Sequence, residues 1–260
     1  MYLMYGDEAD AEEGRGQKFL LYGGIFIEHS KVWAAHLRIE ELRKRAGFAP
    51  EDSLKFAGRT RPEAVSAEAH RKIKSAVIAL AQELGVIFCA YVFLHAIGRA
   101  QEPTDLIEFG ANTVLGRYNE FLTEKNEHGI AKLDRMGKNS FDYAKKKFQR
   151  GLSLPAGDRR LDRIISIGFT CDGASHLASM ADIILGSFRY CVNETDKDIA
   201  GKAMLPKLVP LMWTGTKRGK QYVRERGLIL RPKDVRFAGH QEEFDKLLDR
   251  LQRYLDGNGN

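Results

Sequence analysis

Two apolar stretches near the start of the chain, YLMYGDEA (residues 2–9) and KFLLYGGIFIE (residues 18–28), flank an acidic segment that contains glycines. Their aromatic and β-branched residues favour β-strands. Two such strands joined by a turn-forming segment are typical of a β-hairpin. We therefore expect the sheet of this protein to begin with an antiparallel pair of strands.

The next part of the chain alternates between helical patterns and short apolar runs. Ser30 and Thr104 stand where two helices are expected to begin and are their candidate N-caps, and another helix is expected from about Ser66. The run at residues 86–95 is apolar on both faces, as in a buried central strand. Further strands are expected at residues 129–136 and 163–169, and helices at 31–46, 66–84, 104–124, 140–151 and 173–194. This order, β-β-α-α-β-α-β-α-β-α, indicates an α/β fold in which helices cover a mixed sheet.

The C-terminal part of the chain has a different character. At 260 residues and 43% hydrophobic content, the chain can bury the core of one large domain. We expect an α/β domain over residues 1–195 and a helical, basic extension over residues 196–260 that packs on the same domain. The apolar stretch at residues 203–213 lies in this extension and is a candidate homodimer surface.

Positive charge is concentrated in one segment of the extension. Residues 217–236 hold eight Lys or Arg and two acids, so their net charge of +6 equals that of the whole chain. Such a segment favours a polyanionic partner, with nucleic acid as the leading candidate. Arg218 and Arg224 in this segment, together with Lys145 in a separate lysine run, are expected to contact the backbone of that partner. A solvated linker with scattered charges is the alternative interpretation.

The cysteines and the apolar runs indicate the cellular setting. The three cysteines (Cys89, Cys171 and Cys191) lie in or beside apolar stretches, and no CxxC pattern occurs. We expect reduced, buried thiols and neither a disulfide framework nor a zinc site. The apolar runs are too short for a membrane span, and the first residues do not follow the pattern of a signal peptide. A cytoplasmic location is therefore expected.

One acid stands out because its neighbours are apolar. Asp182 is the only ionisable residue in LASMADIILGSF (residues 177–188), which is part of a predicted helix. His176, Ser179, Asp182 and Gly186 lie three or four residues apart and form one narrow polar stripe. An ionised carboxylate in such surroundings needs a partner or a metal. A functional role for Asp182 is favoured over a cap or a buried ion pair.

A second candidate acid lies at the end of a predicted strand. Asp134 closes a short strand in an α/β pattern, and sites in such folds gather at the carboxyl ends of strands. An ion pair with the neighbouring Lys132 or Arg135 is the alternative.

The acidic segment of the hairpin holds the remaining candidates. Asp7 is the first acid after an apolar strand and can point away from the sheet. Glu8 faces the opposite way if the strand is regular, because side chains alternate along a strand. Asp10, Glu12 and Glu13 fall among glycines and are expected to be solvated turn residues.

Asp7, Asp134 and Asp182 come from two strands and one helix, and they can converge on a hard cation. Carboxylate oxygens suit Mg²⁺ or Mn²⁺, and such ions stabilise the charges that develop during phosphodiester cleavage. The chain has no P-loop, GxGxxG, GxSxG or HExxH motif, which argues against several competing chemistries.

The order of these motifs resembles that of the bacterial domain-of-unknown-function 3800 family. The resemblance covers roughly residues 1–195 and leaves the basic extension outside. The matching features are the acidic Tyr5–Glu8 stretch with Gly23 and Gly24, the Leu54–Phe56 island, the strand-borne Asp134, and the helix pattern from Leu177 through Asp182 to Gly186.

The resemblance implies a ribonuclease-H-like fold with an acidic metal site. In that arrangement Asp7, Asp134 and Asp182 would be the metal ligands, with Glu8 as a companion. The chain departs from the family pattern at two positions. Ser53 stands where many relatives carry an acid, with Glu51 or Asp52 as candidate substitutes, and Ala178 stands where relatives often carry Gln.

Two functions are consistent with these residues. The leading one is a metal-dependent nuclease that uses Mg²⁺ or Mn²⁺, with Asp7, Glu8, Asp134 and Asp182 as its catalytic group. In it, Lys55 would neutralise phosphate charge and His176 would shuttle protons, although a surface lysine and a core or capping histidine are the ordinary roles of such residues. The rival is a catalytically silent ribonuclease-H-like module that binds nucleic acid or a protein, for example in phage defence. The acid missing at Ser53 is its main support.

Overall fold

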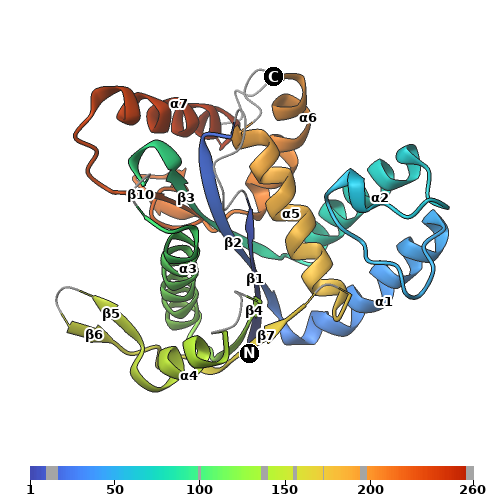
Figure 1. The fold of residues 1–260 in the computed structure, drawn as a ribbon, viewed down its shortest axis with the longest axis horizontal. Helices are drawn as coiled ribbons and strands as arrows, with labels where there is room; N and C mark the ends of the chain where they lie inside the picture. The colour runs from blue at the N-terminus through green and yellow to red at the C-terminus, as the bar shows by residue number, and fades with distance from the viewer. Residues whose placement is uncertain are drawn as a thin grey trace.

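A six-stranded mixed sheet is the centre of the computed structural model, which describes residues 1–9, 17–98, 101–135, 140–154, 157–171, 173–193 and 198–255 (Figure 1). The strand order is β10-β3-β2-β1-β4-β7. The strands are β1 (Tyr2–Ala9), β2 (Phe19–Glu28), β3 (Ile87–Leu94), β4 (Gly129–Asp134), β7 (Ile164–Thr170) and β10 (Leu228–Arg231).

The pairing of these strands follows the expected plan. Strands β1 and β2 pair antiparallel, which confirms the hairpin, and β3 pairs antiparallel with β2. Strands β4 and β7 then add in parallel on the other side of β1. Parallel neighbours need crossover connections, which the helices between them provide. The mixed sheet flanked by helices confirms the α/β architecture expected from the sequence.

Helices cover both faces of the sheet and separate two apolar cores. Helix α5 packs on one face with α1 and α2 beyond it, and α3 packs on the other face (Figure 1). Side chains alternate along β1 and β2, so successive residues enter opposite cores. The helices are α1 (His29–Ala46), α2 (Ala67–Glu83), α3 (Pro103–Glu124), α4 (Ser140–Arg150) and α5 (His176–Asn193). This order confirms the predicted one, with an added hairpin of β5 (Leu152–Leu154) and β6 (Gly157–Arg159).

The structure confirms the expected helix start near Ser66 but neither of the two expected N-caps. Ser66 caps α2, because its hydroxyl accepts a backbone N–H three residues on. Ser30 lies inside α1 and donates its hydroxyl to Glu28, so it is not the N-cap. Thr104 is also inside its helix, because Pro103 occupies the first turn of α3, where the fixed φ of proline suits a helix start.

The C-terminal extension is helical at both ends and also supplies strands. Helix α6 (Asp198–Leu208) leads to a hairpin of β8 (Gly215–Lys217) and β9 (Lys220–Tyr222), and α7 (Ala238–Leu255) ends the described part. Strand β10, from the basic segment, pairs in parallel with β3 and extends the main sheet. The sequence did not predict these strands. Strand β10 ties the extension to the main sheet by backbone hydrogen bonds.

The apolar stretch expected to form a homodimer surface is folded into the core of the same chain. Leu205, Leu208, Leu211, Met212 and Trp213 are all buried. The two leucines of α6 pack with Leu211 and Met212 in the core on the α5 side of the sheet, and Trp213 packs in the core on the α3 side. That basis for a homodimer is therefore wrong.

The three cysteines do not share one environment. Cys89 and Cys191 are buried, as expected, and burial raises the pKa of each thiol to about 12. Cys171 is exposed, which corrects the prediction, because it follows the last residue of β7 at the rim of the sheet. No helix within the described ranges has the length and apolar character that crossing a membrane requires.

Candidate metal centre

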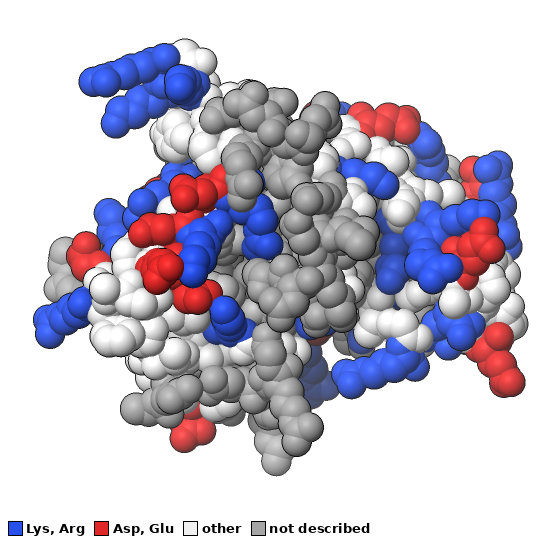
Figure 2. Space-filling view, turned by 90° about the horizontal axis from the view of Figure 1, so that it is seen from above, with Lys and Arg blue, Asp and Glu red and all other residues white. Residues whose placement is uncertain are grey.

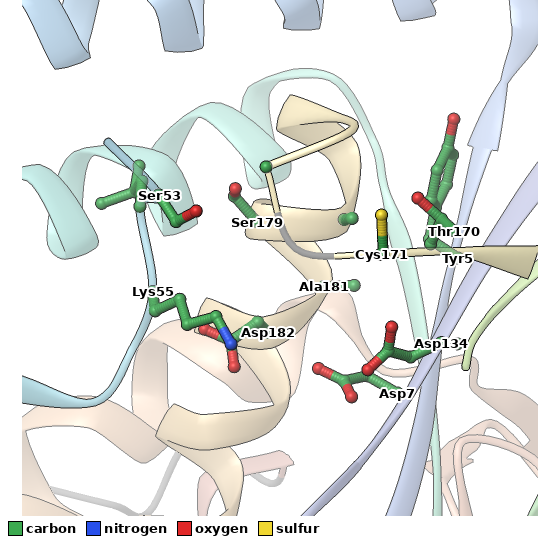
Figure 3. Close-up of a pocket in the computed structure, with 14 residues that line it drawn as sticks. Tyr5, Asp7, Ser53, Lys55, Asp134, Thr170, Cys171, Ser179, Ala181 and Asp182 are labelled. Atoms are coloured by element: carbon green, nitrogen blue, oxygen red, sulfur yellow. The ribbon is translucent and has the colours of Figure 1, made fainter. Parts of the chain in front are cut away.

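The predicted acids meet at one edge of the sheet. Asp7 lies near the end of β1 and Asp134 is the last residue of β4. These strands are parallel, and Gly6 pairs with Leu133, so the two aspartates are level with each other. Helix α5 brings Asp182 to the same pocket (Figure 3). The close-up shows the carboxylates of Asp7 and Asp134 beside each other on the sheet side and Asp182 across from them.

Three of the carboxylates form a tight group. Oxygens of Asp7, Glu8 and Asp134 all lie within 4.8 Å of one another. The backbone N–H of Glu8 donates to Asp7 Oδ1 at 2.8 Å. Strand alternation predicted that Glu8 would face away from Asp7, yet its carboxylate joins the group at the end of β1. The later acids of this segment (Asp10, Glu12 and Glu13) lie outside the described residues.

Asp182 is fixed on the helix side of the pocket. Its Oδ2 accepts the backbone N–H of Phe56 at 2.5 Å, so one carboxylate oxygen is tied to the loop before α2. The side chain of Lys55 extends toward Asp182 from the same loop (Figure 3). The expectation that Lys55 and Asp182 belong to one site therefore has a geometric basis.

The electrostatics of Asp7 show how closely the acids are packed. The pKa of Asp7 is raised well above its usual range. Burial is the main cause, followed by the negative charges of Glu8, Asp182 and Asp134, and the hydrogen bond from the Glu8 backbone opposes the shift. Carboxylates that repel one another in a confined pocket are the donor set that a hard divalent cation neutralises. The residues present therefore fit Mg²⁺ or Mn²⁺.

The Leu54–Phe56 island docks on α5 because of one glycine. A Cβ placed on Gly186 would lie 2.4 Å from the Phe56 ring, so only glycine leaves room for the ring against the helix. Lys74 of α2 donates to the Phe56 carbonyl at 3.0 Å and lies over the ring, 4.4 Å from its centre. These contacts hold the Phe56 backbone in the position from which its N–H donates to Asp182. The spacing of Asp182 and Gly186 thus has a structural cause.

Several lining residues of the pocket were not singled out as functional from the sequence. Ser53, Ser179, Thr170 and Cys171 contribute polar atoms to it. Ser179 lies on the polar stripe of α5, which was the available signal. Thr170 is the last residue of β7 and Cys171 follows it, and only the parallel pairing of that strand with β4 brings them to the pocket.

The structure shows where Ser53 lies, at the position where the resemblance led us to expect an acid. Ser53 lines the pocket, whereas the candidate substitutes Glu51 and Asp52 are not among its lining residues. Asp52 accepts the backbone N–H of Ala49 at 2.7 Å and so stabilises its own loop. The acid expected from the family pattern is therefore replaced by a neutral hydroxyl.

His176 is directed away from the acids. Its Nε2 lies 2.8 Å from Glu40 Oε2 on α1, and its ring stacks on that of His36 with centres 4.8 Å apart. Burial lowers the pKa of His176, and the Glu40 hydrogen bond partly opposes this shift. His176 begins α5, a turn and a half before Asp182, and these contacts hold it against α1.

The other expected cations lie away from the pocket. Lys145 is exposed on α4. Arg218 is in the turn between β8 and β9, and Arg224 is exposed beside the start of β10. Leu228, to which Arg224 is bridged, is three strand spacings from Asp7, or about 14 Å. None of these three cations lines the acidic pocket.

Comparisons with known proteins do not assign the site. No family model matches the chain, and no curated protein matches it. Among solved structures, a chain of the PCNA:RNase HII complex from Archaeoglobus fulgidus is similar, with 11% sequence identity and a TM-score of 0.46. The similarity covers 77% of this chain and 79% of that chain. The functional argument therefore depends on the geometry described above.

Proposed function

We propose that this protein is a divalent-metal-dependent nuclease that hydrolyses phosphodiester bonds in nucleic acid, and that it is a member of the domain-of-unknown-function 3800 family. The observation that carries the proposal is the convergence of Asp7, Asp134 and Asp182 on one pocket, with Glu8 grouped beside Asp7 and Asp134. The negative charges of these other three acids contribute to the raised pKa of Asp7. Repulsion between these carboxylates is unfavourable in the metal-free protein. A bound cation would offset it, which is why such groups occur at functional sites.

Each residue of the pocket has a role in this proposal. Asp7, Asp134 and Asp182 would hold Mg²⁺ or Mn²⁺, and Glu8 would complete the negative field around it. When bound there, the ion would supply Lewis-acid stabilisation of the charge that develops on the phosphate oxygens. Asp182 keeps its orientation through the Phe56 N–H, and Lys55 directs a positive charge to the pocket mouth, where it would orient a phosphate.

The second candidate function is a silent module of the same fold that binds nucleic acid or a protein. The neutral Ser53 favours it, because a site with one carboxylate fewer binds a cation less tightly. Asp182 would then be retained for its hydrogen bond to the Phe56 loop.

Metal binding and cleavage separate the two candidates. Mn²⁺ binding is measured by calorimetry, and cleavage is followed on labelled single-stranded RNA, an RNA–DNA hybrid and duplex DNA. The variants are Asp182→Asn and, as a control, Asp162→Asn, which changes an exposed acid on the loop before β7. We expect Mn²⁺-dependent cleavage that falls at least roughly 100-fold in Asp182→Asn and is unchanged in the control. Equal Mn²⁺ affinity in both variants, with no cleavage of any substrate, would favour the silent module.

A further inference from the structure

A second, larger groove lies beside the acidic pocket. It is formed by the 56–59 loop, one face of α2, and the second half of α5, and its volume is about 750 Å³. That is well above the space a single phosphate ion needs and falls within the range of sites that hold drug-sized ligands, roughly 300–1,000 Å³. The groove can therefore hold more than one chemical group of a chain-like ligand.

The charge of this groove has one sign. Its described lining includes Arg59, Arg71, Lys74 and Arg189 and no acidic side chain. Figure 2 shows Lys and Arg side chains gathered on the side of the molecule where α1 and α2 lie. These four cations come from three separate segments of the chain, so they do not form a basic run in the sequence. Such a concentration favours a polyanion.

Helical spacing explains why the cations of α2 face the groove. Arg71 and Lys74 are three residues apart and Ile78 is one turn further, so all three lie on one face of the helix. Lys72 is on the same helix but outside the groove, where it pairs with Glu68 at 2.7 Å. The chain thus offers a matched pair of neighbouring cations, one inside the groove and one outside it.

The groove also carries aromatic surface. The rings of Phe56 and Tyr190 line it, with centres 6.5 Å apart. Aromatic rings between cations are the pattern that binds single-stranded nucleic acid, because unpaired bases stack on rings while the cations follow the phosphates. Bases of a duplex are already stacked on each other and cannot use these rings.

The groove adjoins the acidic pocket at one short segment. Lys55 and Leu54 line the acidic pocket and the adjacent Phe56 lines the groove. The backbone N–H of Phe56 binds Asp182 and its carbonyl accepts from Lys74, so the two sites share this residue. A strand lying in the groove would therefore pass next to the segment that holds Asp182.

We propose that this groove binds a single-stranded segment of nucleic acid and directs it to the acidic pocket. The identity of that strand as substrate rests on the proposed nuclease function, whereas its binding can be measured without catalysis. Arg59 and Arg71 contact phosphates, and Tyr190 stacks on a base.

The test is fluorescence anisotropy in EDTA, which prevents metal-dependent cleavage. The probes are a labelled mixed-sequence single strand of about 12 nucleotides, as DNA and as RNA, and a hairpin duplex of the same sequence. The variants are Arg59→Ala with Arg71→Ala, Tyr190→Ala, Tyr190→Phe and, as the matched control, Lys72→Ala. Polyglutamate is added as a competitor to detect a site for acidic proteins.

The expected result is tighter binding of the single strand than of the duplex. The double arginine variant should lose roughly tenfold or more in affinity, and its slope of log K against log salt should fall by about 1.4, or about 0.7 for each lost phosphate contact. Tyr190→Ala should lose about tenfold and Tyr190→Phe should retain affinity. Lys72→Ala should bind like the wild type.

Three outcomes would overturn this inference: stronger duplex binding, equal losses in the Lys72→Ala control, or competition by polyglutamate as effective as that by the strand. Cleavage in Mn²⁺ by groove variants that bind normally would reject the groove and leave the nuclease proposal standing. If the wild type cleaves nothing but the groove variants lose binding, the groove proposal would stand and the nuclease proposal would be rejected.

Discussion

Replacing Asp7 by Asn should stabilise the metal-free protein. Two carboxylates 4.8 Å apart repel each other by about 3.5 kcal/mol at an effective dielectric constant of about 20. Asp7 is repelled by two such neighbours, Glu8 and Asp134, and by Asp182. Because its pKa is raised, Asp7 is partly protonated, which reduces this repulsion. We therefore expect a gain of about 2 kcal/mol at pH 8, which corresponds to a rise of roughly 4–8 °C in Tm. Asn retains the oxygen that accepts the Glu8 N–H.

The pH dependence and the response to metal make this prediction specific. The folded-state pKa of Asp7 is raised, so the wild type loses stability as pH rises from the unfolded value of about 4 through the folded one. The advantage of Asp7→Asn should therefore grow with pH. Saturating Mn²⁺ should stabilise the wild type, by about 2.7 kcal/mol at a hundredfold excess over Kd, and not the variant. Thermal unfolding in EDTA and in Mn²⁺ measures both effects, with Asp162→Asn as the control. A variant that is less stable than the wild type at pH 8 in EDTA would refute the reasoning.

Three further substitutions test the framework around the site. Gly186→Ala should displace the Phe56 ring and destabilise the fold by about 1–3 kcal/mol in urea unfolding, whereas Gly58→Ala, with no atom within 4 Å of the added Cβ, should be tolerated. Asn193→Ala should cost about 3 kcal/mol in the same assay, because the buried Asn193 side chain makes three hydrogen bonds to the start of β2. His176→Gln should leave the cleavage rate within about threefold of the wild type, since His176 contacts α1 rather than the acids. A tenfold loss of rate in that variant would instead support the proton-shuttle role considered for His176.

Basic residues show where sequence reasoning about function succeeds and where it does not. The segment at residues 217–236 predicts a polyanionic partner because its basic residues lie close together in the sequence. In the fold, Arg231 pairs with Glu225 and Arg226 pairs with Glu124, so part of that charge is neutralised within the chain. The groove cations are spread over three segments and become a site only when α2 and α5 pack together. Charge density along a sequence is local, whereas an electrostatic surface depends on long-range packing.

The sequence alone predicted the hairpin, the alternation of strands and helices, and Asp182 as a candidate site residue. These features depend on residue periodicity and on the rarity of acids in apolar helices, which are properties of short segments. The three-dimensional structure was needed to show that β10 joins the edge of the sheet, that Glu8 joins Asp7 and Asp134, and that His176 contacts Glu40. Each of these depends on how distant segments pair or on which way a helix is rotated when it packs, and neither is encoded in the local pattern of residues.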